Sequence, residues 1–428
     1  MIIFKNRIKF SSNSSFLNSI LMLVSGTALA QIINIAFYPL ITRLYGPESF
    51  GSLGYFSALL SFIVPFSTLC YPLALVLPKK ETQVRLLVDI SFKLSILVFF
   101  IVAVSIFIID YFYPEIIPFK RSYYFVSIGV FFSSMVMIYS QLAIRRRQYK
   151  LISLLAVIIA VLGGVLKVGV GYFFATDIAL ITISIFLLII NFLCLFFILK
   201  MKINFLELIY LKKKHLALAY RYIRFPLFRM PHAVLAVTSQ IAPVFLLTFY
   251  FGAIYAGYFV LTRTILSAPV ALMGKAVYDV SYPRINDNYN KGLCNYDFIL
   301  KTTMILSVIS LVPLVFMFVF GEFFFMKIFG DEWIVSGTYA AWMCMWFAFN
   351  FFNKAVTAAV SVYSLDGFLF RNGVVNNFLS LTGFLVGALY FNSDIIAIAL
   401  FSCLSVFSQV NLIFRVLHVV KKNESQIS

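Results

Sequence analysis

The stretch LITRLYGPESFG, residues 40–51, separates two long apolar runs, and LLTFYFGAIYAG, residues 246–257, repeats it in outline. At this offset of 206 residues Gly46 matches Gly252, and Gly51 matches Gly257. The offset is close to half of the 428 residues. Internal repeats of this kind are typical of transporters built from two related halves. We therefore predict two equivalent hairpins, one in each half of the chain.

Apolar segments long enough to cross a membrane recur along the whole chain. Hydrophobic residues make up 62% of the sequence and charged residues 12%, against roughly 25% charged residues in soluble domains. A helix needs about 20 apolar residues to cross the hydrocarbon core. We predict an all-α integral membrane protein with about twelve transmembrane helices. The predicted spans are residues 16–41, 52–77, 86–109, 122–143, 151–174, 178–199, 227–250, 254–281, 298–320, 337–362, 371–391 and 395–418.

The basic residues lie mostly in alternate loops between these spans. Lys and Arg number 34 against 16 Asp and Glu. With a cytoplasmic amino terminus, the opposite face holds only Arg43, Lys120, Arg121 and Lys327 outside the spans. This asymmetry obeys the positive-inside rule. We therefore expect both termini to be cytoplasmic, and the basic loops to contact anionic lipid headgroups and not nucleic acid. The predicted cytoplasmic set begins with Lys5, Arg7 and Lys9, includes Lys202 and Lys212, and ends with Lys422.

The longest polar interruption divides the chain into two six-helix halves. It runs from Lys200 to Arg224, after the sixth predicted span. We predict an amino-terminal lobe over residues 1–199, a cytoplasmic linker over 200–226, and a carboxyl-terminal lobe over 227–428 with a short cytoplasmic tail. The five cysteines and three histidines show no disulfide or metal-binding spacing, so we expect no disulfide, metal or cofactor.

The first hairpin also resembles a known family. TRLYGPESFG, residues 42–51, is similar to the hairpin after the first helix in O-antigen flippases, the polysaccharide exporters of the multidrug/oligosaccharidyl-lipid/polysaccharide superfamily. RRRQYK at 145–150, FGDEW at 329–333 and LDG at 365–367 lie where that family has short loop motifs.

This resemblance implies a flippase for an undecaprenyl-pyrophosphate-linked O-antigen (lipopolysaccharide) unit in a bacterial inner membrane. It further implies two six-helix lobes that form a V around a central cavity and give alternating access.

Six basic residues lie inside the predicted spans. A charge at the centre of a membrane helix costs roughly 2.5–3.5 kcal/mol on insertion scales, and it usually faces a protein interior or a water-filled cavity. Almost no carboxylate lies at comparable depth, so we predict a cationic cavity for an anionic cargo. The six residues are Lys93, Lys167, Arg229, Arg263, Lys275 and Lys354.

Arg263 is the first candidate for contact with the pyrophosphate. We expect it about 14 Å from the external end of its helix, and the same span offers only Asp279 as a carboxylate. A guanidinium binds phosphate oxygens through two parallel hydrogen bonds and keeps its charge. Lys354 and Asn350 lie on one face of the tenth predicted helix, and we expect this face to line the cavity.

Several of the remaining candidates have two alternative roles. Lys167 suits a contact on the release side. Gln31 and Asn34, in a polar stripe of the first helix, either bind sugar hydroxyls or only hold helices together. Arg229 either marks an entry site or reaches the headgroups. Lys275 either binds substrate or pairs with a carboxylate four residues on. For Lys93 and Asp89 we predict a structural ion pair.

Other functions fit the sequence less well. A cation-coupled multidrug exporter of the same fold would need buried carboxylates, whereas the acidic residues here lie mostly in loops or at span ends. A lipid II flippase normally has fourteen helices. An O-antigen polymerase usually carries a sizeable external loop, and every predicted external loop here is short. No nucleotide-binding motif occurs, so we predict a transporter and not an enzyme. Its expected partners are the lipid-linked oligosaccharide, membrane lipids and other polysaccharide assembly proteins.

Overall fold

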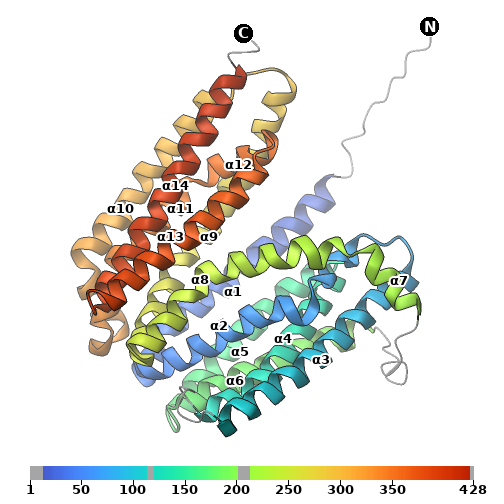
Figure 1. The fold of residues 1–428 in the computed structure, drawn as a ribbon, viewed down its shortest axis with the longest axis vertical. Helices are drawn as coiled ribbons and strands as arrows, with labels where there is room; N and C mark the ends of the chain where they lie inside the picture. The colour runs from blue at the N-terminus through green and yellow to red at the C-terminus, as the bar shows by residue number, and fades with distance from the viewer. Residues whose placement is uncertain (1–12, 113–119, 201–212, 425–428) are drawn as a thin grey trace.

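The computed structural model describes residues 13–112, 120–200 and 213–424, and within these ranges the chain is helical and holds no strand (Figure 1). Eleven of the described helices are long and apolar enough to cross a membrane. The predicted class, an all-α membrane protein with about twelve spans, is confirmed. The basic residues Lys5, Arg7, Lys9, Lys202 and Lys212 lie outside the described residues.

The first half of the chain forms one bundle of long helices. The short elements η1, α7 and η3 lie at the end of this bundle that the sequence predicts to be cytoplasmic. In order the elements are α1 (Asn13–Leu44), α2 (Pro47–Thr68), η1 (Tyr71–Val76), α3 (Glu81–Phe112), α4 (Lys120–Arg145), α5 (Tyr149–Gly171), α6 (Asp177–Leu199), α7 (Lys213–Arg221) and η3 (Phe225–Arg229).

The second half forms the other bundle, with α8 lying between the two. Its elements are α8 (Met230–Tyr250), α9 (Ala253–Asn290), α10 (Tyr296–Phe329), η4 (Asp331–Trp333), α11 (Ile334–Phe352), α12 (Lys354–Val362), α13 (Asp366–Leu389) and α14 (Asp394–Glu424).

The two bundles form a V. Helices α1–α6 and α9–α14 converge where α2 meets α9, and they diverge toward the end where α1 begins, α14 ends and α7 lies (Figure 1). The largest apolar core joins residues of both bundles, among them Phe50, Phe259 and Trp333. Separate cores fill each bundle elsewhere, around Leu87 in one and Val360 in the other. The lobes are therefore fused at the narrow end and independent at the wide end.

Three predicted spans are interrupted in the structure. The second was expected to continue to residue 77, but α2 ends at Thr68, and Leu69 and Cys70 have positive φ before the 3₁₀ turn of η1. Pro72 in the first turn of η1 explains the break, because proline has no amide hydrogen to donate to an α-helix. The seventh span begins with the π-turn η3. The tenth is divided into α11 and α12 at Asn353.

Two glycines allow the closest approach between the lobes. A Cβ atom on Gly51 of α2 would lie 1.9 Å from the carbonyl oxygen of Ala253, and a Cβ on Gly257 of α9 would lie 1.9 Å from that of Pro47. Pro47 and Ala253 are themselves equivalent at the offset of 206 residues. The predicted hairpins therefore pack against each other as a nearly two-fold symmetric pair. Small residues at crossing points let membrane helices come this close.

The narrow end is also closed by loop motifs from opposite halves of the chain. The indole Nε1 of Trp333 donates to the carbonyl oxygen of Thr42 at 3.1 Å, and the Trp333 ring meets Phe50 edge-on at 5.1 Å. Arg43 donates to the carbonyl oxygen of Lys327 at 2.9 Å. The FGDEW and TRLYGPESFG motifs thus form a latch across the two lobes.

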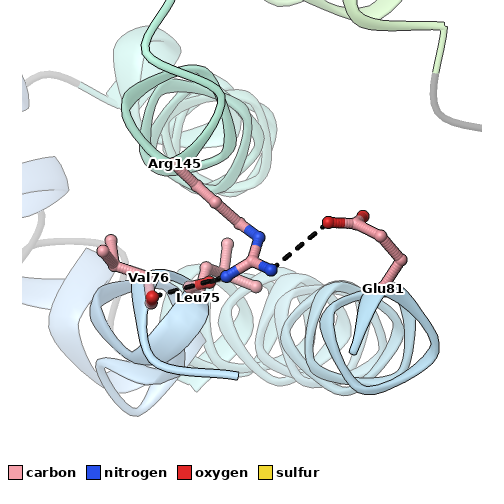
Figure 2. Close-up of polar contacts among 4 residues, drawn as sticks. All are labelled: Leu75, Val76, Glu81 and Arg145. Atoms are coloured by element: carbon pink, nitrogen blue, oxygen red, sulfur yellow. Dashed lines mark hydrogen bonds and ion pairs between the residues drawn. The ribbon is translucent and has the colours of Figure 1, made fainter. Parts of the chain in front are cut away.

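At the wide end, basic residues of the RRRQYK motif cap carbonyl groups. Arg145, at the end of α4, donates to the carbonyl oxygens of Leu75 and Val76 at 2.9 and 3.3 Å, and it pairs with Glu81 at 3.2 Å (Figure 2). Arg146 donates to the carbonyl oxygen of Leu199 at the end of α6. These arginines satisfy helix-end acceptors that would otherwise lack a donor.

We expect Gly51→Ala and Gly257→Ala each to destabilise the protein by about 3 kcal/mol, because the new methyl group overlaps backbone atoms of the other lobe. The measurement is the thermal unfolding midpoint in detergent. Gly169→Ala is the matched control, since a Cβ there meets nothing within 4 Å. Equal midpoints for all three variants would contradict the close packing.

We expect Cys294 to report which side of the membrane holds the wide end. It lies exposed between α9 and α10, whereas the other four cysteines are buried or half-buried. The nearby Glu424 carboxylate raises the pKa of the Cys294 thiol, so less reactive thiolate is present at neutral pH. An impermeant maleimide should label inverted membrane vesicles but not intact cells, faster as the pH rises and faster in Glu424→Gln. Labelling of intact cells would reverse the topology.

Candidate functional site

A cavity of about 350 Å³ lies between the lobes just beyond the glycine contact. It is lined by residues of α1, α2, α5, α6, α8 and α9, so both halves of the chain contribute to it. Two of the predicted intramembrane cations, Lys167 of the first lobe and Arg263 of the second, face this same cavity. Its polar lining is completed by Tyr38, Ser57, Ser61, Ser184, Thr264 and Ser267.

Arg263 is held by an uncharged partner. One terminal nitrogen of its guanidinium donates to the backbone carbonyl of Gln240 on α8, and the other donates to the Gln240 side-chain oxygen, both at 2.8 Å. Within the described residues no carboxylate forms an ion pair with Arg263. The two hydrogen bonds to Gln240 fix the orientation of the guanidinium but do not neutralise its positive charge.

Lys167 lies on α5 at a point that a buried tyrosine fixes. The hydroxyl of Tyr45, which is completely buried, donates to the backbone carbonyl of Lys167 at 3.0 Å. The Lys167 ammonium itself has no hydrogen bond or ion pair with the described part of the chain. Membrane proteins retain such costly charges where they meet a substrate or an ion.

Two further cavities adjoin this one within the first lobe. One of about 170 Å³ shares Tyr38 and Lys167 with it and contains Asn34. Another of about 570 Å³ shares Ser57, Ser61 and Ser184. No Asp or Glu of the described residues lines any of the three cavities, and these residues contain no group of three potential metal ligands. The cavities therefore form a cationic, hydroxyl-lined space.

The internal repeat relates the cavity residues of the two lobes. At the offset of 206 residues Ser57 corresponds to Arg263, and Ser61 corresponds to Ser267. Asn34 corresponds in the same way to Gln240, the residue that holds Arg263. The two lobes thus offer equivalent helix faces to the cavity, but only the second lobe places a cation at this position. The repeat makes the site nearly symmetric in backbone and asymmetric in charge.

Lys354 and Asn350 lie outside this cavity, on either side of the boundary between α11 and α12. The Lys354 ammonium donates to the Asn350 side-chain oxygen at 2.8 Å across the break at Asn353. The aliphatic part of Lys354 packs over Gly274 of α9. Neither residue lines the cavity of Arg263. The hydrogen bond between residues four apart keeps the two side chains on one face, as their spacing predicts. Their part in binding stays a prediction.

The other candidates are spread over the lobes. Arg229 is exposed at the end of η3, and Lys275 is exposed on α9, where the described residues show no ion pair between it and Asp279. Gln31 is half-buried on α1. None of these three lines the cavity of Arg263.

The predicted structural pair of Lys93 and Asp89 is confirmed at 2.9 Å, and His215 of α7 approaches the same carboxylate at 2.7 Å.

Sequence reasoning missed most of the hydroxyls in the site. Ser57 and Ser61 lie four residues apart on α2, and Thr264 and Ser267 lie next to Arg263 on α9. The signal was present as small hydroxyl residues on one helix face. Such residues are common in membrane helices, so spacing alone does not separate a cavity lining from ordinary packing.

Comparison with known proteins places this geometry in a family. A family model described as a polysaccharide biosynthesis protein matches residues 40–337, which include both hairpins and every lining residue of the Arg263 cavity except Tyr38. The chain belongs to this family. No match was found among curated protein sequences.

Solved transporter structures share the fold. The chain resembles an inward-facing multidrug resistance MATE family transporter of the MOP superfamily, with a TM-score of 0.65 at 11% identity over 95% of this chain and 94% of the other. The lipid II flippase MurJ, in an inward closed conformation, gives 0.61 at 13% identity over 97% and 90%.

A MOP superfamily transporter from Pyrococcus furiosus, described as having a binding pocket of reverse polarity, gives 0.58 at 12% identity over 96% and 95%. At these identities the likeness concerns the fold, which is that of MOP superfamily transporters.

Lys93 and Lys167, the two intramembrane lysines of the first lobe, should respond differently to substitution. We expect Lys167→Met to raise the thermal unfolding midpoint, because it removes a charge that has no partner in the described residues, at the expense of function. Lys93→Met should lower the midpoint, since it takes one partner from a nearly buried carboxylate. The expected loss in the free energy of unfolding is as much as about 3 kcal/mol. Differential scanning fluorimetry in detergent measures both. A lower midpoint for Lys167→Met would assign Lys167 a structural role.

Proposed function

We propose that this protein is a flippase for lipid-linked oligosaccharides. Its substrate is an undecaprenyl-pyrophosphate-linked O-antigen unit, which it moves from the inner to the outer leaflet of a bacterial inner membrane. The family of polysaccharide biosynthesis proteins and the MOP transporter fold support transport of a polysaccharide precursor. The proposed activity is transport by alternating access and involves no catalytic step.

The observation that carries this proposal is a pair of cations from opposite lobes in one cavity that has no carboxylate among its described lining residues. Lys167 and Arg263 belong to different lobes and line the same space. A pyrophosphate carries several negative oxygens, so it can bind both cations at once. Arg263 would bind two of its oxygens through parallel hydrogen bonds, while Lys167 would act as a point charge. A single headgroup would then link the two lobes that move.

The hydroxyls around the cations suit a sugar. The hydroxyl of Ser184 donates to the backbone of its own helix at 2.8 Å, as does that of Thr264 at 2.7 Å. Their oxygen lone pairs remain available as acceptors for sugar hydroxyls. The adjoining cavity of about 570 Å³, within the range typical of ligand sites, adds the side chains of Ser133 and Asn191. The polyprenyl tail would stay in the bilayer, outside the space between the lobes.

The V-shaped arrangement of the lobes corresponds to one conformational state of a transport cycle, the one that is open at the wide end. The charge distribution predicts that the wide end is cytoplasmic, so the cavity would open toward the leaflet where the substrate is made. The latch of Trp333, Thr42 and Arg43 closes the opposite end. For release, this latch must open while the wide end closes. Opening this end would also separate the apolar core that joins the two lobes there.

The main alternative is a cation-coupled multidrug exporter. That activity would favour a cationic drug and a titrating carboxylate near it. The cavity instead holds two cations and, among its described lining residues, no Asp or Glu. The sign of the charge therefore favours an anionic cargo over a cationic one.

Substitution of Arg263 tests the proposal. We expect Arg263→Ala to lower surface O-antigen at least tenfold, because a charge-assisted hydrogen bond contributes about 1.5–3 kcal/mol. Arg263→Lys should fall between Arg263→Ala and the wild type, since it keeps the charge but loses the planar fork. Lys301→Ala removes an exposed cation from α10 and is the matched control. Surface O-antigen is quantified in a deletion strain that expresses each variant at equal membrane levels.

Gln240→Glu separates charge from packing at the same site. This variant keeps the size of the side chain and its contact with Arg263, but adds a carboxylate that neutralises the guanidinium. We expect transport to fall nearly as far as in Arg263→Ala, with the thermal unfolding midpoint unchanged or raised. Normal surface O-antigen in both Gln240→Glu and Arg263→Ala would exclude Arg263 as the pyrophosphate anchor.

A further inference from the structure

A separate cavity lies in the first lobe, away from the three cavities described above. It measures about 570 Å³ and runs between α3, α7 and the end of α2, near η1. Its walls are mostly aliphatic and aromatic side chains, among them Leu69, Ile90, Leu94, Leu97 and Phe100. The one tyrosine hydroxyl in its lining, that of Tyr71, donates to the carbonyl oxygen of Ala219. This groove has few free hydrogen-bonding groups for a sugar, and its apolar walls suit a hydrocarbon chain.

Charged residues gather at one end of the groove. Lys93 and His215 line it, and both lie within 3 Å of the Asp89 carboxylate, at 2.9 and 2.7 Å. Arg85 lies one turn before Asp89 on the same face of α3, and it is exposed. Lys213 and Lys214, also exposed, open α7 directly before His215. The lysines and Arg85 outnumber the single carboxylate, so this end of the groove is positive.

The other end of the groove continues into the lipid-facing side of α3. Leu97 and Phe100 belong to the groove, and Ile101 and Val104 beyond them are 53% and 54% exposed. In a membrane protein an exposed apolar face of this kind contacts hydrocarbon. Helix α7 combines basic residues with exposed Leu216 and Tyr220, the composition of a helix that lies in the headgroup region. The groove therefore connects the headgroup layer to the hydrocarbon core.

We propose that this groove binds an anionic phospholipid of the leaflet next to α7. One acyl chain would lie along α3 between Leu94 and Phe100, and the phosphate would lie near Lys93, Lys213 and Lys214. The volume is within the range of small-molecule sites. An acyl chain gains little hydrophobic free energy by moving from lipid into an apolar groove, so the headgroup charge must supply the selectivity. Basic residues next to a membrane surface provide that attraction.

The bound lipid would fasten α7 to the first lobe. Apart from the His215 contact with Asp89, α7 is joined to α3 mainly by apolar packing that includes Leu218. A lipid chain between α3 and α7 adds contact area to both helices. Because α7 lies in the segment that connects the lobes, the lipid would set where the linker leaves the first lobe. This role is independent of the cationic cavity, with which the groove shares no lining residue.

Lipid titration of the purified full-length protein tests the proposal. Phosphatidylglycerol and phosphatidylcholine with identical acyl chains are added in detergent, and binding is followed by native mass spectrometry and by the thermal unfolding midpoint. We expect bound phosphatidylglycerol and a raised midpoint, with little effect of phosphatidylcholine. Equal binding of both lipids would overturn the proposal.

Variants locate the site. The double change Lys213→Gln with Lys214→Gln affects only exposed side chains and should weaken phosphatidylglycerol binding about tenfold. Leu94→Trp should fill the groove and abolish binding. Arg263→Ala should bind the lipid normally, so failure of the transport proposal would not affect this one. Unchanged binding in the lysine double variant would overturn the proposal. So would saturation by undecaprenyl phosphate without binding of phosphatidylglycerol, which would assign the groove to the substrate lipid.

Discussion

The close approach of α2 and α9 at Gly51 and Gly257 is the constraint on which the rest of the molecule depends. Each glycine faces a backbone carbonyl of the other lobe at a distance that leaves no room for a side chain. Ser57 and Arg263 each lie six residues further along these helices, about 9 Å beyond the contact. The glycine pair therefore sets both the narrow end of the V and the depth of the cavity. It also brings the Arg263 guanidinium of one lobe to the space that Lys167 of the other lobe faces.

The cations of this protein divide according to their partners. Lys93 pairs with a carboxylate, while Arg145 and Arg146 cap carbonyl groups at helix ends, so these charges hold the lobe together. Arg263 is held by a neutral amide, and the described residues provide no partner for the Lys167 ammonium. A buried charge whose partner is present is compensated, and removing that partner destabilises the fold. An uncompensated charge inside a membrane protein costs stability and usually marks a binding or transport site. That no described carboxylate neutralises Arg263 is thus a better guide to the site than the presence of the cation.

Local sequence patterns predicted the helices well and the cavity only in part. Apolar length predicted the spans, and the repeat at 206 residues predicted the paired hairpins. The break at Leu69 and Cys70 was missed, although Pro72 marks it, because hydropathy does not register a missing amide hydrogen. The division of the tenth span at Asn353 was missed for another reason. Asn353 is buried and its side-chain amide donates to the Gln409 carbonyl oxygen of α14 at 3.2 Å, and a pattern within one helix cannot reveal a contact made by another. The lobe boundaries remain predictions from the sequence.

The sequence by itself determined the membrane class, the approximate number of spans, the internal repeat and the choice of Arg263 as first candidate. Hydropathy, charge and periodicity can be read along a single helix, without knowledge of its neighbours. Only the tertiary structure decided which residues share the cavity. Lys167, Arg263 and Gln240 come from three helices, and what makes Arg263 a candidate anchor is that its partner is an amide and not a carboxylate. Electrostatic compensation depends on distances of a few ångströms between helices far apart in sequence, and those distances exist only once the two glycines have brought the lobes together.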